Sequence, residues 1–76
     1  MAKTSYATLF NKALEAGSRR DYAEAETTLT RIVAETDSMP EAWLYLGRAR
    51  HALGDHERAV PAFAAFLGYE PDSAAG

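Results

Sequence analysis

The apolar residues of the chain recur with a helical period. In the first stretch they follow the i, i+3, i+4, i+7, i+8 spacing that lines one face of a helix. These residues are Tyr6, Leu9, Phe10, Ala13 and Leu14. The spacing predicts a helix over residues 4–16, and Thr4 or Ser5 can cap it because a side-chain oxygen there accepts an orphan backbone N–H. Gly17 is expected to end this helix.

A second helix is predicted to begin at Asp21. The run Asp21-Tyr22-Ala23-Glu24 places an acidic cap three residues before a glutamate, which is the pattern of a capping box. The apolar stripe that follows has the same helical spacing. It consists of Tyr22, Ala25, Leu29, Ile32 and Val33. Residues 35–37 are expected to end the helix.

A third helix is predicted from about Pro40 to Leu53. The run Ser38-Met39-Pro40-Glu41 has the pattern of another capping box, with a proline in the first turn, where its missing N–H has no cost. Gly54 is expected to stop the helix. Alanine is frequent and β-branched residues are few outside residues 27–33, which favours helices over strands throughout.

A fourth helix is predicted to begin after a cap at Asp55 and to end near Pro71. Four of its apolar residues are expected to face inward. They are Ala59, Phe63, Phe66 and Leu67. Pro61 removes one backbone hydrogen bond inside the helix, so we expect the helix to bend there.

Equivalent residues of the two predicted helix pairs are 34 positions apart. The equivalent pairs are Asp21 and Asp55, Ala25 and Ala59, Leu29 and Phe63, and Val33 and Leu67. A fixed offset of this size indicates two copies of one helix-turn-helix unit.

The second copy resembles a tetratricopeptide repeat, whose pattern is W-x2-L-G-x2-Y, then A-x3-F, then P. The residues that match this pattern are Trp43, Leu46, Gly47, Ala59, Phe63 and Pro71. The resemblance implies an all-α fold of two tandem helix-turn-helix repeats, with four antiparallel helices arranged as in an α-solenoid. It divides a single domain, 1–76, into repeat 1 (4–37), repeat 2 (38–72) and a tail (73–76). Trp43 is then expected in the core rather than on a ligand.

The first copy is more degenerate, and its first helix fits best when Gly17 is aligned with Gly54. This alignment makes residues 18–20 a three-residue insertion and puts Tyr6 in the place of Trp43. The second copy departs from the family pattern at Arg50, where the family prefers tyrosine. The stem of Arg50 is expected to pack while its guanidinium reaches outward.

Composition excludes several classes of function. The 76 residues include 8 basic and 11 acidic ones, giving a net charge of -3, so the basic excess typical of nucleic-acid binding is absent. The lack of cysteine excludes disulfides, thiolate zinc sites and a cysteine nucleophile. No signal-peptide core and no run of ~20 apolar residues occurs, so a soluble, cytoplasmic protein without membrane contacts is expected.

Catalytic chemistry has no support in the sequence. It contains no G-x-S-x-G elbow and no Gly-rich phosphate loop, and four short helices leave little room for a deep pocket of a few hundred Å³. His51 and His56 are five residues apart, do not share a helix face, and have no metal-ligand spacing. We therefore expect no enzyme activity, no cofactor and no metal site.

The polar side of the third helix is the better functional candidate. In tetratricopeptide repeats the first helix of each pair lines a concave groove that binds peptides. By this resemblance, the predicted groove residues are Asn11, Glu41, Leu44, Tyr45, Arg48 and His51. Arg48 can bind a carboxylate with two parallel hydrogen bonds, and Asn11 can bond a peptide backbone. The alternative is an ordinary solvated helix face without a ligand.

The end of the second repeat suggests a second surface. Repeat stacks need about three units, and the last usually has a polar outer face. Without a third unit, an apolar patch would be exposed on the fourth helix. Its expected members are Phe63, Phe66, Leu67 and Tyr69. Two readings follow: self-association as a dimer, helix swap or other small homo-oligomer, or a structural spacer within a longer array.

Overall fold

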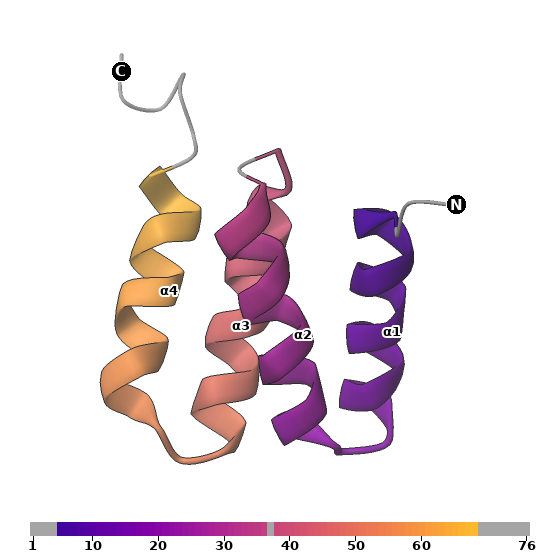
Figure 1. Ribbon diagram of the computed structural model, residues 1–76. Helices are drawn as coiled ribbons and strands as arrows, with labels where there is room; N and C mark the ends of the chain where they lie inside the picture. The colour runs from indigo at the N-terminus through magenta and orange to yellow at the C-terminus, as the bar shows by residue number, and fades with distance from the viewer. Residues whose placement is uncertain (1–4, 37, 69–76) are drawn as a thin grey trace.

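The computed structural model describes residues 5–36 and 38–68, and it contains no strand in that part of the chain. The helices, in chain order, are α1 (Tyr6–Ser18), α2 (Tyr22–Glu35), α3 (Pro40–Ala52) and α4 (His56–Gly68). Figure 1 shows that the helices alternate in direction, with the α1–α2 and α3–α4 links at one end and the α2–α3 link at the other. The predicted all-α fold of two helix-turn-helix pairs is confirmed.

Side-chain caps begin three of the helices as predicted. The Ser5 hydroxyl accepts a hydrogen bond from the Ala7 N–H at 3.2 Å. Asp21 accepts one from the Glu24 N–H at 3.3 Å, and Asp55 does the same for the Arg58 N–H at 3.4 Å. Each bond satisfies one of the N–H groups that have no partner inside the helix.

The predicted capping box at the start of α3 is wrong. The N-cap is Met39, which makes no side-chain capping bond, and Pro40 occupies the first turn. Ser38 turns away from the helix, because its N–H and its hydroxyl both meet the Thr36 hydroxyl, at 3.1 and 2.8 Å. Because Pro40 has no N–H, the first turn of α3 needs fewer capping partners than the other helices.

The turn after α1 has the geometry of a Schellman motif. The Asp21 N–H donates to the Ala16 carbonyl at 2.7 Å, and the Arg20 N–H donates to the Gly17 carbonyl at 2.9 Å. Arg20 has a φ of 65°, the left-handed conformation that the residue after such a helix requires. Helix α1 therefore runs past Gly17, and the prediction that Gly17 ends it is wrong.

The turn after α3 repeats this geometry. The Asp55 N–H donates to the Arg50 carbonyl at 2.8 Å, the Gly54 N–H donates to the His51 carbonyl at 3.0 Å, and Gly54 has a φ of 86°. Arg20 thus stands where the second repeat has Gly54. The two first helices keep the 34-residue offset, so the predicted three-residue insertion at 18–20 is wrong.

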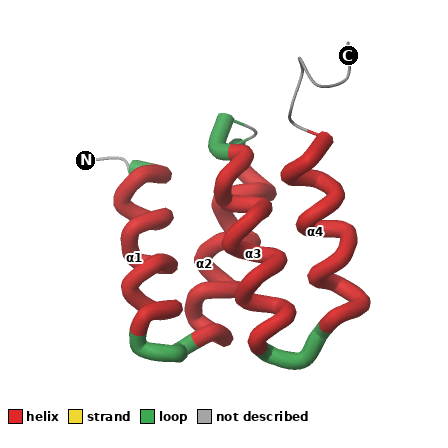
Figure 2. Tube along the Cα trace, turned by 180° about the vertical axis from the view of Figure 1, so that it is seen from behind, coloured by secondary structure: helices red, strands yellow, loops and turns green. Residues whose placement is uncertain are grey.

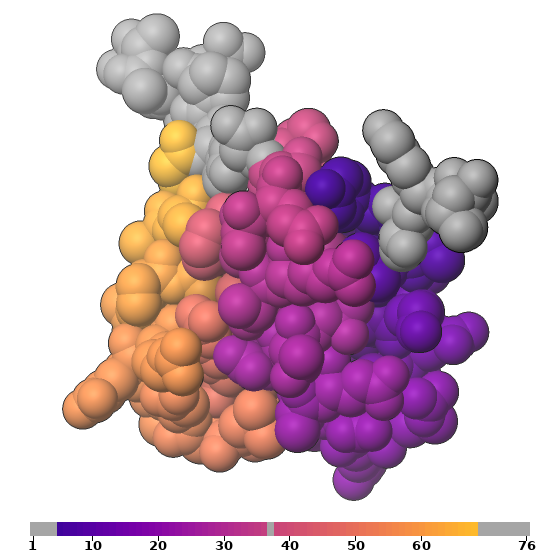
Figure 3. Space-filling model, viewed as in Figure 1, coloured from indigo at the N-terminus to yellow at the C-terminus, as the bar shows by residue number. Residues whose placement is uncertain are grey.

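One hydrophobic cluster runs through the four helices. Its buried members are Leu9, Ala13, Ala16, Ala25, Leu29, Ile32, Ala42, Leu46, Ala49 and Ala62. Trp43 is half-buried and packs against this cluster, as the repeat pattern predicts. Many of these side chains are alanines, which allow the helix backbones to approach closely. Figure 2 shows the arrangement of the four helices from behind. Figure 3 shows the front, where α2 lies between α1 and α4.

Gly47 marks the closest approach between α3 and α4. A Cβ atom added to Gly47 would lie 2.8 Å from Cε1 and 2.9 Å from Cδ1 of Phe63, so the phenyl ring rests on the α3 backbone. At the corresponding positions of repeat 1 the chain has Ala13 and Leu29, both buried. A smaller side chain on the second helix thus accompanies a larger residue on the first.

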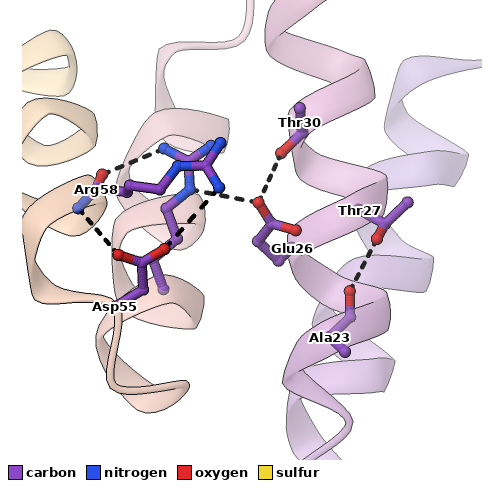
Figure 4. Close-up of polar contacts among 7 residues, drawn as sticks. Ala23, Glu26, Thr27, Thr30, Asp55 and Arg58 are labelled. Atoms are coloured by element: carbon purple, nitrogen blue, oxygen red, sulfur yellow. Dashed lines mark hydrogen bonds and ion pairs between the residues drawn. The ribbon is translucent and has the colours of Figure 1, made fainter.

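Arg50 is buried, with only 9% of its surface exposed, so the prediction that its guanidinium reaches outward is wrong. Its Nε lies 3.4 Å from Oε2 of Glu26, and its NH1 group donates to the Arg58 carbonyl at 3.2 Å. Figure 4 shows Glu26 on α2 beside Thr30, whose hydroxyl donates to the same carboxylate oxygen at 3.3 Å. Arg50 therefore ties repeat 2 to repeat 1 and to the first turn of α4.

No helix within the described residues combines the length and the apolar character that crossing a membrane requires.

Candidate functional site

An open pocket of about 690 Å³ lies between the two repeats. Helices α1 and α3 supply most of its walls, α2 adds a tyrosine and an alanine, and α4 adds a phenylalanine. The lining residues are Ala13, Leu14, Gly17, Ser18, Tyr22, Ala25, Tyr45, Arg48, Ala49, His51, Ala52 and Phe63. This volume falls in the range of small-molecule and side-chain sites. The pocket is open rather than deep, so the expectation that four short helices leave little room for a deep pocket stays a prediction.

Tyr45 is held from two sides. Its ring meets Phe10 of α1 edge to face, with ring centres 5.3 Å apart and planes at 74°. The guanidinium carbon of Arg48 lies 5.5 Å from the centre of the same ring. Such an aromatic pair contributes about 0.5–1.5 kcal/mol beyond the burial of its area. The contacts therefore fix Tyr45 at the wall of the pocket and keep Arg48 beside it.

Arg48 presents its charge to solvent. The ion pairs within the described residues involve four other arginines, so in this part of the chain no carboxylate neutralises Arg48. An exposed guanidinium next to an aromatic ring is suited to bind a carboxylate by two parallel hydrogen bonds. The site thus offers one positive group at the edge of a mainly apolar wall.

The structure divides the predicted groove residues into two groups. Tyr45, Arg48 and His51 line the pocket. Asn11 and Glu41 are exposed but do not line it, and Leu44 is half-buried outside it.

Several lining residues were missed by sequence reasoning. Leu14, Gly17 and Ser18 lie 34 positions before Arg48, His51 and Ala52, so they are their equivalents in repeat 1. The presumed insertion at 18–20 displaced this correspondence and hid them. The constant offset of the other equivalent pairs was the signal that would have found them.

The residues predicted for self-association differ in exposure. Phe63 packs its ring on Gly47 and lines the pocket, and Phe66 is half-buried. Leu67 is 66% exposed, as is Val60, which lies seven residues before it on α4. Tyr69 and the predicted tail 73–76 lie outside the described residues. The exposed apolar part of α4 is therefore centred on Val60 and Leu67.

His51 and His56 meet across the turn between α3 and α4. Their Nδ1 atoms are 2.9 Å apart, and their ring centres are 4.6 Å apart with planes tilted by 58°. Both residues are exposed. The two residues belong to different helices and meet because the turn folds the start of α4 back toward the end of α3.

Comparison with known proteins agrees with this architecture. A family model described as the tetratricopeptide repeat matches residues 10–75. No curated protein and no solved structure matches the chain. Repeats of this family generally mediate protein–protein interactions and typically serve as non-catalytic scaffolds. Since the match spans most of the chain and the helices form two equivalent pairs, the chain belongs to the tetratricopeptide repeat family.

Proposed function

We propose that this chain binds a segment of another protein in the pocket between its two repeats. The observation that supports this most directly is the meeting of Tyr45, Arg48 and His51 with the exposed Leu14 around one open volume of about 690 Å³. A surface with apolar walls and a few placed polar groups is the usual form of a binding site. The proposal is the concave-face function that the family resemblance predicted.

The chemistry of the pocket indicates what the segment carries. Leu14, Tyr22 and Phe63 provide apolar surface that can accept an apolar side chain. Arg48 can pair with a carboxylate that follows or precedes this side chain. We therefore expect a segment with an apolar residue next to Asp, Glu or a C-terminal carboxylate. Glu41 lies on the same helix face as Tyr45 and Arg48, so a longer segment would pass it.

A peptide-display screen followed by fluorescence anisotropy tests the proposal. Arg48→Ala should lower the affinity for the selected peptide by about tenfold or more, because a hydrogen bond to a charged group contributes roughly 1.5–3 kcal/mol. Tyr45→Ala should also weaken it. Arg31→Ala is the matched control, since Arg31 is an exposed arginine on α2 that does not line the pocket. Equal losses for Arg31→Ala and Arg48→Ala, with helicity retained, would refute pocket binding.

A second proposal is self-association through the exposed side of α4. It is favoured by the spacing of Val60, Ala64 and Leu67, which places three exposed apolar residues along one side of the helix. Sedimentation should show a dimer or small oligomer that Val60→Glu with Leu67→Glu converts to monomer. Leu53→Glu is the control, because Leu53 is 50% exposed and follows the end of α3 rather than lying on α4. A wild-type monomer at high micromolar concentration would sink this proposal.

The alternative to both proposals is that the chain is a structural spacer within a longer array of repeats and has no ligand of its own. A chain that selects no peptide and remains monomeric would favour it. We also propose that the protein is cytoplasmic, and cell fractionation tests this location.

A further inference from the structure

We propose that His51 and His56 form a two-imidazole site for a divalent transition metal that prefers right-angled coordination, with Cu(II) bound most tightly. The site lies at the turn between α3 and α4, and one of its two residues, His51, also lines the pocket between the repeats. Its basis is the position of two exposed imidazole rings whose Nδ1 atoms are 2.9 Å apart. The two side chains are the only histidines of the chain.

A hydrogen bond between the two rings accounts for the nitrogen distance but less well for the ring positions. A straight N–H···N bond of this length would place the ring centres about 5.3 Å apart, because each nitrogen lies about 1.2 Å from its ring centre. The observed separation of the ring centres is 4.6 Å. The two nitrogens and the two ring centres therefore do not lie on one line, so at least one nitrogen lone pair does not point straight at the other nitrogen.

A shared metal ion is compatible with both distances. An ion about 2.0 Å from each nitrogen, with a right angle between the two bonds, places the nitrogens about 2.8 Å and the ring centres about 4.5 Å apart. The structure has 2.9 and 4.6 Å. A tetrahedral angle would instead need nitrogens about 3.3 Å apart. The geometry thus favours adjacent positions of a tetragonal ion, as Cu(II) or Ni(II) adopts, over tetrahedral Zn(II).

The fold holds both ligands in place before the metal arrives. The Gly54 N–H donates to the carbonyl of His51, and the Asp55 N–H donates to the Arg50 carbonyl, which fixes the turn that joins the two histidines. Arg50 is itself anchored to Glu26 and to the Arg58 carbonyl. Among the described residues no group of three or more His, Cys, Asp or Glu side chains could hold a metal ion, so water completes the coordination.

Titration of the full chain with Cu(II) in a non-coordinating buffer tests the proposal. The quenching of Trp43 fluorescence and the electron paramagnetic resonance spectrum report binding, and the spectrum should show two coupled imidazole nitrogens. His51→Asn and His56→Asn should each lower the affinity for Cu(II) by about tenfold or more. The double variant should lose little further affinity beyond either single variant, because chelation needs both rings. Zn(II) should bind wild type more weakly than Cu(II).

Thermal unfolding gives a second readout that does not depend on the probe. Cu(II) should raise the melting temperature of wild type and leave that of each variant unchanged, because only the native fold brings the rings together. Both residues are exposed, so the variants should keep the helical circular dichroism of wild type. Single variants that bind Cu(II) as tightly as wild type, or a spectrum with one nitrogen, would overturn the site and leave the hydrogen-bonded pair as the correct account. Zn(II) binding as tight as Cu(II) would overturn the right-angled geometry.

Discussion

Replacing Gly47 by alanine tests the contact on which the packing of the second repeat depends. The added Cβ would lie 2.8, 2.9 and 3.0 Å from three carbons of the Phe63 ring, so the ring must move by several tenths of an ångström. Such overpacking costs about 1–3 kcal/mol, whereas alanine gains about 1 kcal/mol of helix propensity over glycine. The pocket borders the ring and gives it some room. We therefore expect a net loss of about 1 kcal/mol.

Urea unfolding followed by circular dichroism measures this loss, and Gly17→Ala is the matched control. Gly17 also lies inside a helix, but a Cβ there meets nothing within 4 Å. It should therefore stabilise the chain by up to about 1 kcal/mol through propensity alone. In thermal unfolding, 1 kcal/mol corresponds to a shift of about 4–8 °C for a domain of this size.

A second substitution separates steric overlap from other causes. Repeat 1 has Ala13 opposite Leu29 at the corresponding positions, so the Gly47→Ala, Phe63→Leu double variant copies a pair that the chain already contains. The double variant should be more stable than the sum of the single changes predicts, by about 1 kcal/mol or more. Stabilisation by Gly47→Ala equal to that by Gly17→Ala, or strict additivity with Phe63→Leu, would show that the Phe63 ring does not press on the α3 backbone.

Three other changes test the turns, the inter-repeat ion pair and the caps. Arg20→Gly should stabilise the chain by about 0.5–1 kcal/mol in urea unfolding, because glycine adopts the φ of 65° without strain; a destabilised variant would contradict the left-handed turn. Arg50→Met should destabilise the chain by about 1–3 kcal/mol, because it leaves the half-buried Glu26 carboxylate without its cation. Adding Glu26→Gln should restore part of the lost stability, and no recovery would argue against the Arg50–Glu26 ion pair. Asp21→Ala should destabilise the chain by about 1 kcal/mol because it removes the cap of α2, whereas Ser38→Ala should change stability by less than about 0.5 kcal/mol. Equal losses of stability in thermal melts would indicate that Ser38 does cap α3.

The helices could be predicted because their signals are local. Apolar spacing and caps such as Asp21 and Asp55 depend on residues a few positions apart, and both caps occur in the structure. The end of α1 was mispredicted because glycine is the usual residue in the left-handed position after a helix. Here Arg20 takes that position and Gly17 stays helical, and the backbone bonds of the turn hold this arrangement. The preference for glycine after a helix therefore predicted the end of α1 less well than the constant 34-residue offset between the repeats does.

The features that sequence reasoning missed depend on residues far apart in the chain or on turn geometry. Arg50 is buried because Glu26, 24 positions earlier on another helix, supplies its partner, and no local period indicates such a pair. His51 and His56 belong to different helices and meet only because the intervening turn reverses the chain. Of the predicted groove residues, Arg48 lines the pocket together with Leu14, which lies 34 positions earlier on α1.

Chemical-shift mapping of a selected peptide on the isotope-labelled chain shows where the peptide binds. If the segment binds between the repeats, the largest changes should fall on the backbone amides of Leu14, Gly17, Ser18 and Ala52, which line the pocket from both sides. Arg48→Ala should reduce these changes at equal peptide concentration. Changes centred on Val60 and Leu67 of α4, or spread evenly over the chain, would contradict binding in the pocket.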